Sequence, residues 1–349
     1  MNIQELLMQC IKLRASDLHL SSGLPPLLRI DGDLVRVSDV ALNHEQIHEA
    51  VLRIMSPIQQ ANFKEKMECD FSFNLPDVSR FRVNVFHQVR GVSVAFRCIP
   101  NRIPRLEELN APAVFSDLVH SPRGLILVTG PTGSGKSTTL AAMVDLLNQS
   151  SSQHILTIED PIEFVHISNQ CLMHQREVGG HTLSFDNALR AAMREDPNVI
   201  MVGEMRDLET IRLAITAAET GHLVLGTLHT SGAAKTIDRI VDVFPPEEKE
   251  MVRSMLSESL NAVISQVLCK RKDGLGRVAA YEIMLGTTGV RNLIREGKVA
   301  QLYSAIQTGG RAGMQTLDQS LSALVDKGLI EVSQARAKAK YPDSFEVAN

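Results

Sequence analysis

The chain reads Gly130-Pro131-Thr132-Gly133-Ser134-Gly135-Lys136-Ser137-Thr138 directly after the apolar run Leu125-Ile126-Leu127-Val128. This G-x-x-x-x-G-K-S pattern is typical of a phosphate-binding loop, in which backbone N–H groups and the helix dipole converge on one concavity. Its three glycines permit backbone angles that a side chain disfavours. We therefore predict that residues 130–138 bind polyphosphate, with Lys136 reaching the β- and γ-phosphates and Ser137 ligating Mg²⁺.

The residues on either side of this loop argue against a chance match. The preceding run has the composition of a buried strand, and the following residues place Leu140, Val144 and Leu147 on one helical stripe. Strand and helix signals then alternate, as in a parallel α/β core. The predicted strands are 125–128, 155–159, 199–203 and 223–228, and the predicted helices are 138–148, 185–195 and 207–219. A long helix over about 247–268, a hairpin across 270–284 and helical structure from 288 onward complete this region.

The first hundred residues predict a separate α+β domain. Helical spacing of apolar residues over 3–13 gives way to a period of two. The predicted β elements are a hairpin over 27–37 about Asp31-Gly32, a strand over 71–75 that ends at a Pro76-Asp77 turn, and a hairpin over 81–96.

Arginines share the outer face of the last hairpin. If its turn lies between Val89 and Arg90, Arg82 is directly across from Arg97, and Arg80 lies on the same face. Like charges opposed on a sheet are destabilising. Two interpretations stay open: the long side chains splay into solvent, or an anion docks between them. The phosphate loop elsewhere in the chain adds weight to the second.

The length of 349 residues predicts two domains, because single hydrophobic cores stop growing near ~250–300 residues. Four of the 14 prolines lie between positions 100 and 122, which indicates a linker. We predict a smaller N-terminal domain over 1–99, a linker over 100–122, an α/β core over 123–287 and a helical segment over 288–349.

Acidic residues follow two predicted strands at the carboxyl edge, where a doubly wound sheet gathers its ligands. Glu159, Asp160 and Glu163 follow one strand, and this cluster favours Mg²⁺ or a polarised water, with solvated loop acids as the alternative. Glu204 follows the apolar run Val199-Ile200-Met201-Val202 in the form of a Walker B strand, with Glu replacing the more usual Asp. We predict that it holds a Mg²⁺-bound water or orients the attacking one.

Two further patterns involve histidine. His222 and His229 flank the strand at 223–228 at an odd spacing, which sends them to opposite faces and disfavours a shared metal. One can sense the γ-phosphate while the other is structural, or each is simply hydrogen-bonded.

The segment His44-Glu45-Gln46-Ile47-His48 fits the zinc-protease motif H-E-x-x-H. Val51 and Ile54, however, stand where the extended motif needs Gly and His. Asn43 as N-cap with Gln46 three residues later makes the start of a helix a sufficient explanation.

Composition is that of an ordinary soluble protein, with 44% hydrophobic and 22% charged residues, and predicts a cytoplasmic location without a membrane span or signal peptide. The net charge of −4 makes nucleic acid an unexpected main partner, although an acidic hexamer can still carry a basic pore. Five scattered cysteines without a C-x-x-C pair predict buried thiols.

In combination and order, these motifs resemble the secretion ATPases of type II secretion and type IV pilus systems, and among them the pilus retraction motors. The resemblance covers nearly the whole chain, from Ser16-Asp17-Leu18-His19-Leu20 to Gly289-Val290-Arg291-Asn292-Leu293-Ile294-Arg295-Glu296. The latter segment matches the retraction signature A-I-R-N-L-I-R-E except at its first two positions. Read without the family, it is a short amphipathic helix. The longer N-terminal region and four-cysteine metal site usual in extension motors are missing from this chain.

The resemblance implies a RecA-like P-loop core, a PAS-like N-terminal domain, and a homohexamer that binds ATP and Mg²⁺ between the two domains. It implies that Arg82 and Arg97 approach the nucleotide, in cis or in trans. It further implies Glu163 as the catalytic carboxylate, Glu204 as the Walker B acid, His222 and His229 as couplers of nucleotide state to movement, and Arg291, Asn292 and Arg295 as signature residues.

The predicted function is an ATP-hydrolysing motor that depolymerises type IV pili at the inner face of the bacterial inner membrane. Its implied partners are a membrane platform protein and an accessory paralogous ATPase. The alternative is that the chain is itself the accessory paralogue, which binds nucleotide and regulates a sister motor with little turnover of its own. A GTPase switch is disfavoured because the chain has no N-K-x-D motif, and a DNA-translocating relative would show salt-sensitive DNA binding.

Overall fold

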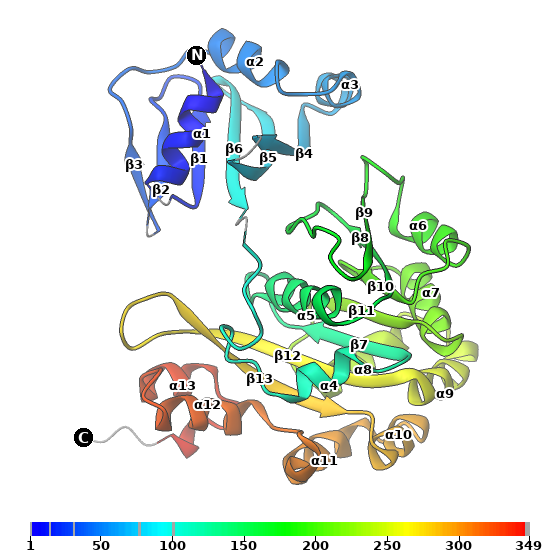
Figure 1. Ribbon diagram of the computed structural model, residues 1–349. Coiled ribbons are helices and arrows are strands. Elements are labelled where there is room, and N and C mark those ends of the chain that lie inside the picture. Colours follow the sequence, from blue (N-terminus) through cyan, green and yellow to red (C-terminus); the bar gives the residue numbers. More distant parts are fainter. Residues whose placement is uncertain (1, 14, 31, 76–77, 100–101, 346–349) are drawn as a thin grey trace. The chain divides into compact units, whose positions relative to one another are not determined.

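The computed structural model describes residues 2–13, 15–30, 32–75, 78–99 and 102–345 (Figure 1). The chain divides into two compact units, one formed by residues 1–102 with 161–165 and the other by 103–160 with 166–349. The predicted turns at Asp31-Gly32 and Pro76-Asp77 and the predicted start of the linker at Pro100 involve residues outside the described set. No helix of the described residues is long and apolar enough to cross a membrane.

The first unit is built on an antiparallel sheet of six strands in the order β3-β2-β1-β6-β5-β4. Its strands are β1 (Asp17–Ser21), β2 (Leu27–Ile30), β3 (Asp33–Arg36), β4 (Glu68–Leu75), β5 (Ser79–Gln88) and β6 (Gly91–Ile99). Its helices are α1 (Ile3–Lys12), α2 (His44–Leu52) and α3 (Pro57–Lys66). Gln88 pairs with Gly91, so the last hairpin turns at Val89 and Arg90 as predicted, and Arg82 lies across from Arg97.

The core of this unit lies between the sheet and its helices. Alternate residues of β5 and β6, such as Val83, Val85 and Val94, are buried together with Leu7 of α1 and Ile47 of α2. This period of two leaves the arginines of the hairpin on the opposite face.

Helix α2 begins at the capping box predicted for the H-E-x-x-H segment. Asn43 Oδ1 accepts a hydrogen bond from the Gln46 N–H, and Gln46 Oε1 accepts one from the Asn43 N–H, both at 2.9 Å. His44 Nδ1 accepts the backbone N–H of Val92 at 3.1 Å, which ties the helix to β6. The first histidine of the segment therefore holds a helix against the sheet.

The second unit contains a seven-stranded sheet in the order β13-β12-β7-β11-β10-β8-β9, parallel except for the β12–β13 pair. The strands are β7 (Gly124–Thr129), β8 (His154–Glu159), β9 (Leu172–Glu177), β10 (Val199–Val202), β11 (Leu223–Leu228), β12 (Leu260–Lys270) and β13 (Arg277–Leu285). β7, β10 and β11 are buried along their whole length, as expected for parallel strands covered on both faces. The prediction of an α/β core is confirmed.

Helices cover both faces of this sheet (Figure 1). They are α4 (Val114–Val119), α5 (Lys136–Ser150), α6 (Phe185–Ala192), α7 (Leu208–Glu219), α8 (Ala233–Asp242) and α9 (Lys249–Ser259). The predicted helical segment after residue 288 contains α10 (Thr288–Arg295), α11 (Leu302–Thr308), α12 (Leu317–Asp326) and α13 (Val332–Lys338). Successive residues of one strand belong to different cores: Leu125 packs with α7 and α9, and Ile126 packs with α4 and α5.

The predicted helix over 247–268 is wrong in its second half, because α9 ends at Ser259 and β12 begins at Leu260. Apolar residues buried on both faces of a strand satisfy a helical period as well as a strand pattern, so periodicity alone cannot separate them. β9 and α8 were not predicted. β9 has the polar sequence Leu-Met-His-Gln-Arg-Glu, which gives little strand signal. All five cysteines are free, and all but Cys98 are buried.

Candidate functional site

The loop between β7 and α5 has the backbone of a phosphate cradle. Gly130, Gly133 and Gly135 have φ values of 145°, 76° and 89°, in the region that favours glycine. A Cβ on Gly130 would also lie 2.4 Å from the carbonyl oxygen of Gln266. Gly135 caps α5 without any side-chain hydrogen bond to the first turn, so the N–H groups of that turn face the concavity of the loop. Such N–H groups and the helix dipole together bind anions.

The side chains of the loop divide into buried and accessible groups. Lys136 is buried, and its Nζ donates to the carbonyl oxygens of Gly130 at 2.9 Å and Pro131 at 3.1 Å. The ammonium group is thus hydrogen-bonded to two carbonyl oxygens of the loop, and phosphate oxygens can replace these carbonyls as acceptors. Pro131 and Thr132 are exposed, and Ser137 and Thr138 are half-buried in the first turn of α5.

Two buried hydroxyl groups beside the loop lack a protein partner. Thr129 Oγ1 and Ser134 Oγ make no hydrogen bond, although both residues are almost fully inaccessible. A buried hydroxyl without a partner costs free energy, so such groups point to a ligand or a bound water. Together with the Gly130 cradle, these hydroxyl groups fit a phosphate group and hard oxygen-ligated cations such as Mg²⁺.

Gln266 of β12 supports the loop from below, and sequence reasoning missed it. Its Nε2 donates to the Ser134 carbonyl at 2.6 Å, and its Oε1 accepts from Thr139 Oγ1 at 2.9 Å. Gln266 is buried, so both bonds lie away from water. The residue was overlooked because a helix was predicted over 247–268, and that prediction gave no reason to expect contact between this segment and the phosphate loop. The available signal was a polar glutamine within an apolar run.

Replacing Gln266 with leucine should loosen the phosphate loop without removing any phosphate ligand. The substitution removes the donor to the Ser134 carbonyl and the acceptor of the Thr139 hydroxyl, and a buried polar group left unsatisfied costs about 1–3 kcal/mol. We expect a lower free energy of unfolding and weaker ADP binding, measured by urea denaturation and calorimetric titration. Gln307 is exposed on α11, so Gln307→Leu serves as the control. If Gln266→Leu keeps the wild-type stability and ADP affinity, Gln266 does not support the phosphate loop.

The acids at and after the end of β8 are distributed over two units. Glu159 is buried, and its Oε1 accepts from Thr157 Oγ1 at 2.7 Å and Gln175 Nε2 at 3.1 Å. Asp160 is exposed at the end of the strand. Glu163 lies in the segment 161–165, which belongs to the first compact unit.

Glu204, at the end of β10, lies in a charged cluster. Arg206 binds both of its carboxylate oxygens, with Nε–Oε1 and Nη2–Oε2 distances of 2.5 and 2.6 Å, and His229 Nε2 lies 3.0 Å from Oε1. Burial opposes ionisation, but the Arg206 hydrogen bond and the charges of His229 and Arg206 keep the pKa of Glu204 below its ordinary value. Glu204 is therefore a carboxylate at neutral pH, able to accept protons or hold a cation's water.

The two predicted histidines lie at opposite ends of β11. His229 follows its carboxyl end and reaches Glu204, because Val202 of β10 pairs with Gly226 of β11. His222 precedes the strand, and its Nδ1 lies 3.0 Å from the Ala217 carbonyl oxygen at the end of α7. The structure therefore unites His229 with the acid and leaves His222 at the other edge of the sheet.

The predicted arginine pair of the first unit acquires a partner that was not foreseen. Asp17 of β1 is buried, and its Oδ1 accepts from Arg97 Nε at 2.9 Å, while Arg29 Nε lies 3.8 Å from Oδ2. Burial would raise the pKa of Asp17, but hydrogen bonds from Ser16 and Arg97 lower it. This carboxylate offsets the repulsion between Arg97 and Arg82. The side chain of Arg97 nevertheless remains 70% exposed.

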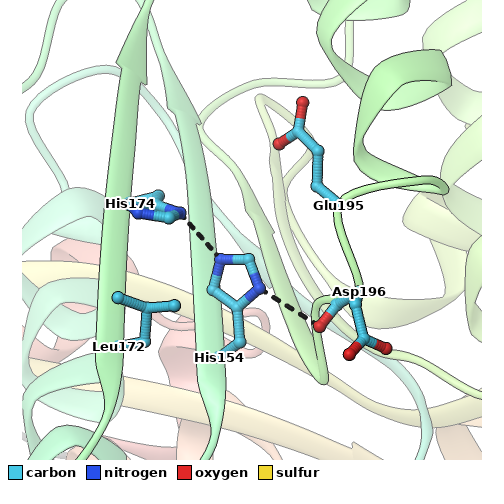
Figure 2. A pocket seen from close by; sticks show the side chains of 5 residues that line it. All are labelled: His154, Leu172, His174, Glu195 and Asp196. Carbon is cyan, nitrogen blue, oxygen red and sulfur yellow. Dashed lines mark hydrogen bonds between the residues drawn. The ribbon is translucent and has the colours of Figure 1, made fainter.

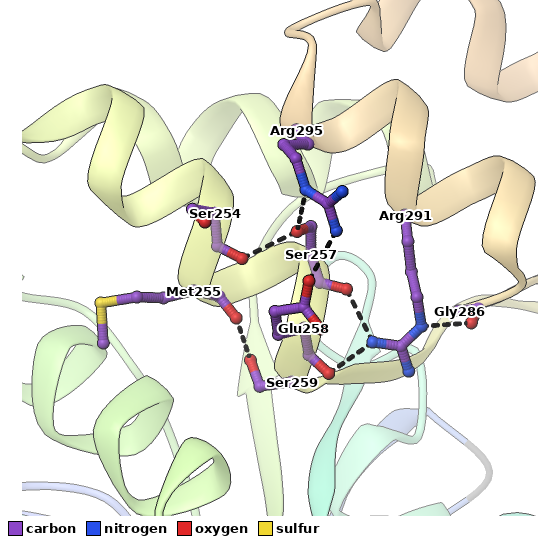
Figure 3. A network of polar contacts seen from close by, with 8 residues as sticks. All are labelled: Ser254, Met255, Ser257, Glu258, Ser259, Gly286, Arg291 and Arg295. Atoms are coloured by element: carbon purple, nitrogen blue, oxygen red, sulfur yellow. Dashed lines mark hydrogen bonds and ion pairs between the residues drawn. The ribbon is translucent and has the colours of Figure 1, made fainter.

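The signature arginines stabilise the junction between α9 and β12 (Figure 3). Arg291 donates to the carbonyl oxygens of Gly286 at 2.7 Å, Ser257 at 2.6 Å and Glu258. Arg295 pairs with the Glu258 carboxylate at 2.6 Å. The carbonyls at a helix C-terminus lack intrahelical partners, and a cation there satisfies them. Asn292, between the two arginines, is exposed.

Comparison with known proteins supports one family. The chain matches the family described as type II/IV secretion system protein over residues 1–273. It is 64% identical over 345 residues to the type IV pilus retraction ATPase PilT of Pseudomonas aeruginosa, covering 99% of this chain and 100% of that protein. It is 40% identical to the type IV pilus ATPase PilU of the same organism, covering 97% and 89% of the two chains.

A solved structure agrees with these sequence matches. The crystal structure of the pilus retraction motor PilT with bound ADP has a TM-score of 0.92 to this chain at 48% identity, covering 99% of this chain and 98% of that one. The match extends over both compact units and includes the phosphate loop. The chain belongs to the type II/IV secretion system protein family.

Proposed function

We propose that this protein is a P-loop ATPase motor that powers retraction of type IV pili and thereby twitching motility. The observation that carries the proposal is that the phosphate loop at 130–138 and the Glu204 cluster both follow parallel strands at the carboxyl edge of one sheet, on a fold that matches PilT over nearly its whole length. The proposed substrate is ATP, and the products are ADP and phosphate.

The phosphate loop binds the nucleotide through its backbone N–H groups and the N-terminus of α5. Lys136 exchanges the carbonyls of Gly130 and Pro131 for the β- and γ-phosphate oxygens. The exchange is favourable because a charge-assisted hydrogen bond to an anion is stronger than one to a neutral carbonyl. Gln266 keeps the loop backbone in place during this change.

Mg²⁺ is the proposed cofactor, and the donors present fit it. The Ser137 hydroxyl is the direct protein ligand, and Glu204 acts through a water. Arg206 and His229 already occupy three of the roughly four lone-pair positions of the Glu204 carboxylate, so an indirect contact suits the geometry. When bound, the metal neutralises charge on the phosphates.

Glu204 and His229 of the second unit are proposed catalytic residues, together with Glu163 of the segment 161–165. Glu204 orients the attacking water, since phosphoryl transfer depends on position and charge neutralisation. His229 hydrogen-bonds to the same carboxylate and so senses the γ-phosphate through it. Glu163 is the proposed catalytic carboxylate of the acidic segment, with Glu159 and Asp160 in supporting positions.

Assembly completes the proposal. We propose a homohexamer in which Arg82 and Arg97 of the first unit act on the nucleotide, at the inner face of the bacterial inner membrane. The proposed partners are a membrane platform protein and an accessory paralogous ATPase. The higher identity to PilT than to PilU favours the motor over the accessory role.

The test is complementation of twitching. A strain that lacks its own retraction ATPase and regains normal twitching and pilus retraction with this chain alone would support the motor. We expect restoration close to the parental level. Restoration only when a second pilus ATPase is co-expressed would identify the accessory role instead. No restoration in either case, with the protein present at normal levels, would contradict the proposal.

A further inference from the structure

Two histidines face each other at the edge of the sheet opposite the phosphate loop. His154 begins β8, and His174 lies on β9, the outermost strand. Figure 2 shows the two rings turned toward each other, with His154 Nε2 and His174 Nδ1 separated by 3.0 Å. They line a pocket of about 510 Å³ together with Leu172, Glu195 and Asp196.

Hydrogen bonding fixes the tautomer of His154. Its Nδ1 lies 3.1 Å from the backbone carbonyl oxygen of Asp196, which can only accept, so Nδ1 carries the proton. In the neutral ring Nε2 is then an unprotonated acceptor directed at His174. This is the arrangement of metal-binding histidines, whose second ring N–H is held by a carbonyl or carboxylate.

Hydrogen bonds to Asn198 hold the backbone that carries the His154 ring. Asn198 Oδ1 accepts the His154 N–H, and the Asn198 N–H donates to the His154 carbonyl, both at 2.9 Å. Asp196, whose carbonyl holds the ring, has a φ of 55°, a left-handed conformation that is uncommon outside glycine. The loop before β10 thus presents its carbonyl to His154 in a constrained geometry.

We propose that His154 and His174 together bind one zinc ion. Two nitrogen ligands of a tetrahedral zinc lie ~3.3 Å apart, because each Zn–N bond is about 2.0–2.1 Å. The observed nitrogen separation of 3.0 Å is close to this value. Because the two nitrogens are directed at each other in a hydrogen bond, metal binding also requires the rings to turn until both lone pairs converge on the ion. The His174 proton moves from Nδ1 to Nε2, so both rings stay neutral while each presents a lone pair to the metal.

The other coordination positions belong to water or to Glu195. Glu195 lines the same pocket, although Arg176 Nη1 binds its Oε1 at 2.9 Å. No group of three or more metal-ligating side chains is assembled among the described residues, so the site is an open one with two protein nitrogens. It is also separate from the proposed magnesium site, because His154 begins β8, whereas Glu204 follows the carboxyl end of the neighbouring parallel strand β10.

Calorimetric titration of the metal-free full-length protein with Zn²⁺ tests this site. We expect His154→Ala and His174→Gln each to bind one zinc equivalent fewer than the wild type. His181 is a third histidine close to β9, outside the pocket, so His181→Ala is the matched control and should keep the full stoichiometry. The difference in zinc stoichiometry between each variant and the wild type excludes zinc bound by the chain's other histidines.

Two further readouts separate loss of the ligand from loss of the fold. ADP affinity should be unchanged in all variants, and Zn²⁺ should raise the unfolding temperature of the wild type more than that of His174→Gln, because a ligand that binds only the native state stabilises it. Equal zinc stoichiometry in all four proteins would overturn the proposal. A loss confined to one of the two variants would also overturn it, since a shared ion requires both nitrogens.

Discussion

Lys136→Ala is expected to abolish ATP turnover. The buried ammonium group is the only side-chain cation that the phosphate loop itself carries, and its loss removes charge-assisted hydrogen bonds to the transferring phosphate. We expect phosphate release to fall by at least about 10³-fold, the scale of other charge-stabilising groups in phosphoryl transfer. Steady-state phosphate release at saturating ATP measures the effect.

Lys298→Ala is the matched control, because Lys298 is exposed and pairs with a neighbouring carboxylate, Glu296. It should retain wild-type turnover. Circular dichroism and thermal unfolding should show that Lys136→Ala is folded. Turnover of Lys136→Ala within a few-fold of wild type would refute the assignment of the loop as the catalytic phosphate site.

Glu204→Gln is expected to stop turnover while leaving nucleotide binding intact. The amide keeps the size of the side chain but removes the negative charge that Arg206 neutralises and that would hold the metal-bound water. A group that positions or deprotonates a reactant contributes roughly 10²–10⁴-fold, so we expect a loss in that range. ADP affinity should change little, because the backbone of the phosphate loop is untouched.

Phosphate release and calorimetric ADP titration together check this expectation. Glu209→Gln supplies the control, since Glu209 is a half-buried acid of α7 that also pairs with arginines, Arg190 and Arg212. Normal turnover in Glu204→Gln would move the catalytic role to another acid. Loss of ADP binding together with turnover would instead indicate that Glu204 supports the binding site.

The conformation of the phosphate loop was predictable because it depends on local sequence. A strand, nine contiguous residues and a helix define the cradle, and the three positive φ values follow from glycine at 130, 133 and 135. The contact between Glu204 and His229 was partly predictable from the sequence, since both residues follow strands of one parallel sheet at its carboxyl edge. That these two strands are neighbours is a property of the topology, which the sequence pattern did not specify.

The missed features depend on contacts between distant segments. Gln266 reaches Ser134 across more than a hundred residues, and its strand has an apolar pattern that a helix satisfies equally well. Asp17 and Arg97 come from strands β1 and β6. These strands are far apart in the sequence, so no turn motif between them predicts that they pair. Arg206 lies only two residues after Glu204, and an arginine so close to a candidate acid was a usable signal.

The position of Arg291 affects how genetic data on the signature segment should be interpreted. Its guanidinium hydrogen-bonds to carbonyls at the end of α9, where the chain changes from helix to strand. A motility defect caused by Arg291→Ala therefore reports first on the integrity of this junction, whatever partner the segment meets. Asn292 is exposed between the two arginines, so substitutions there can separate recognition of a partner from maintenance of the fold.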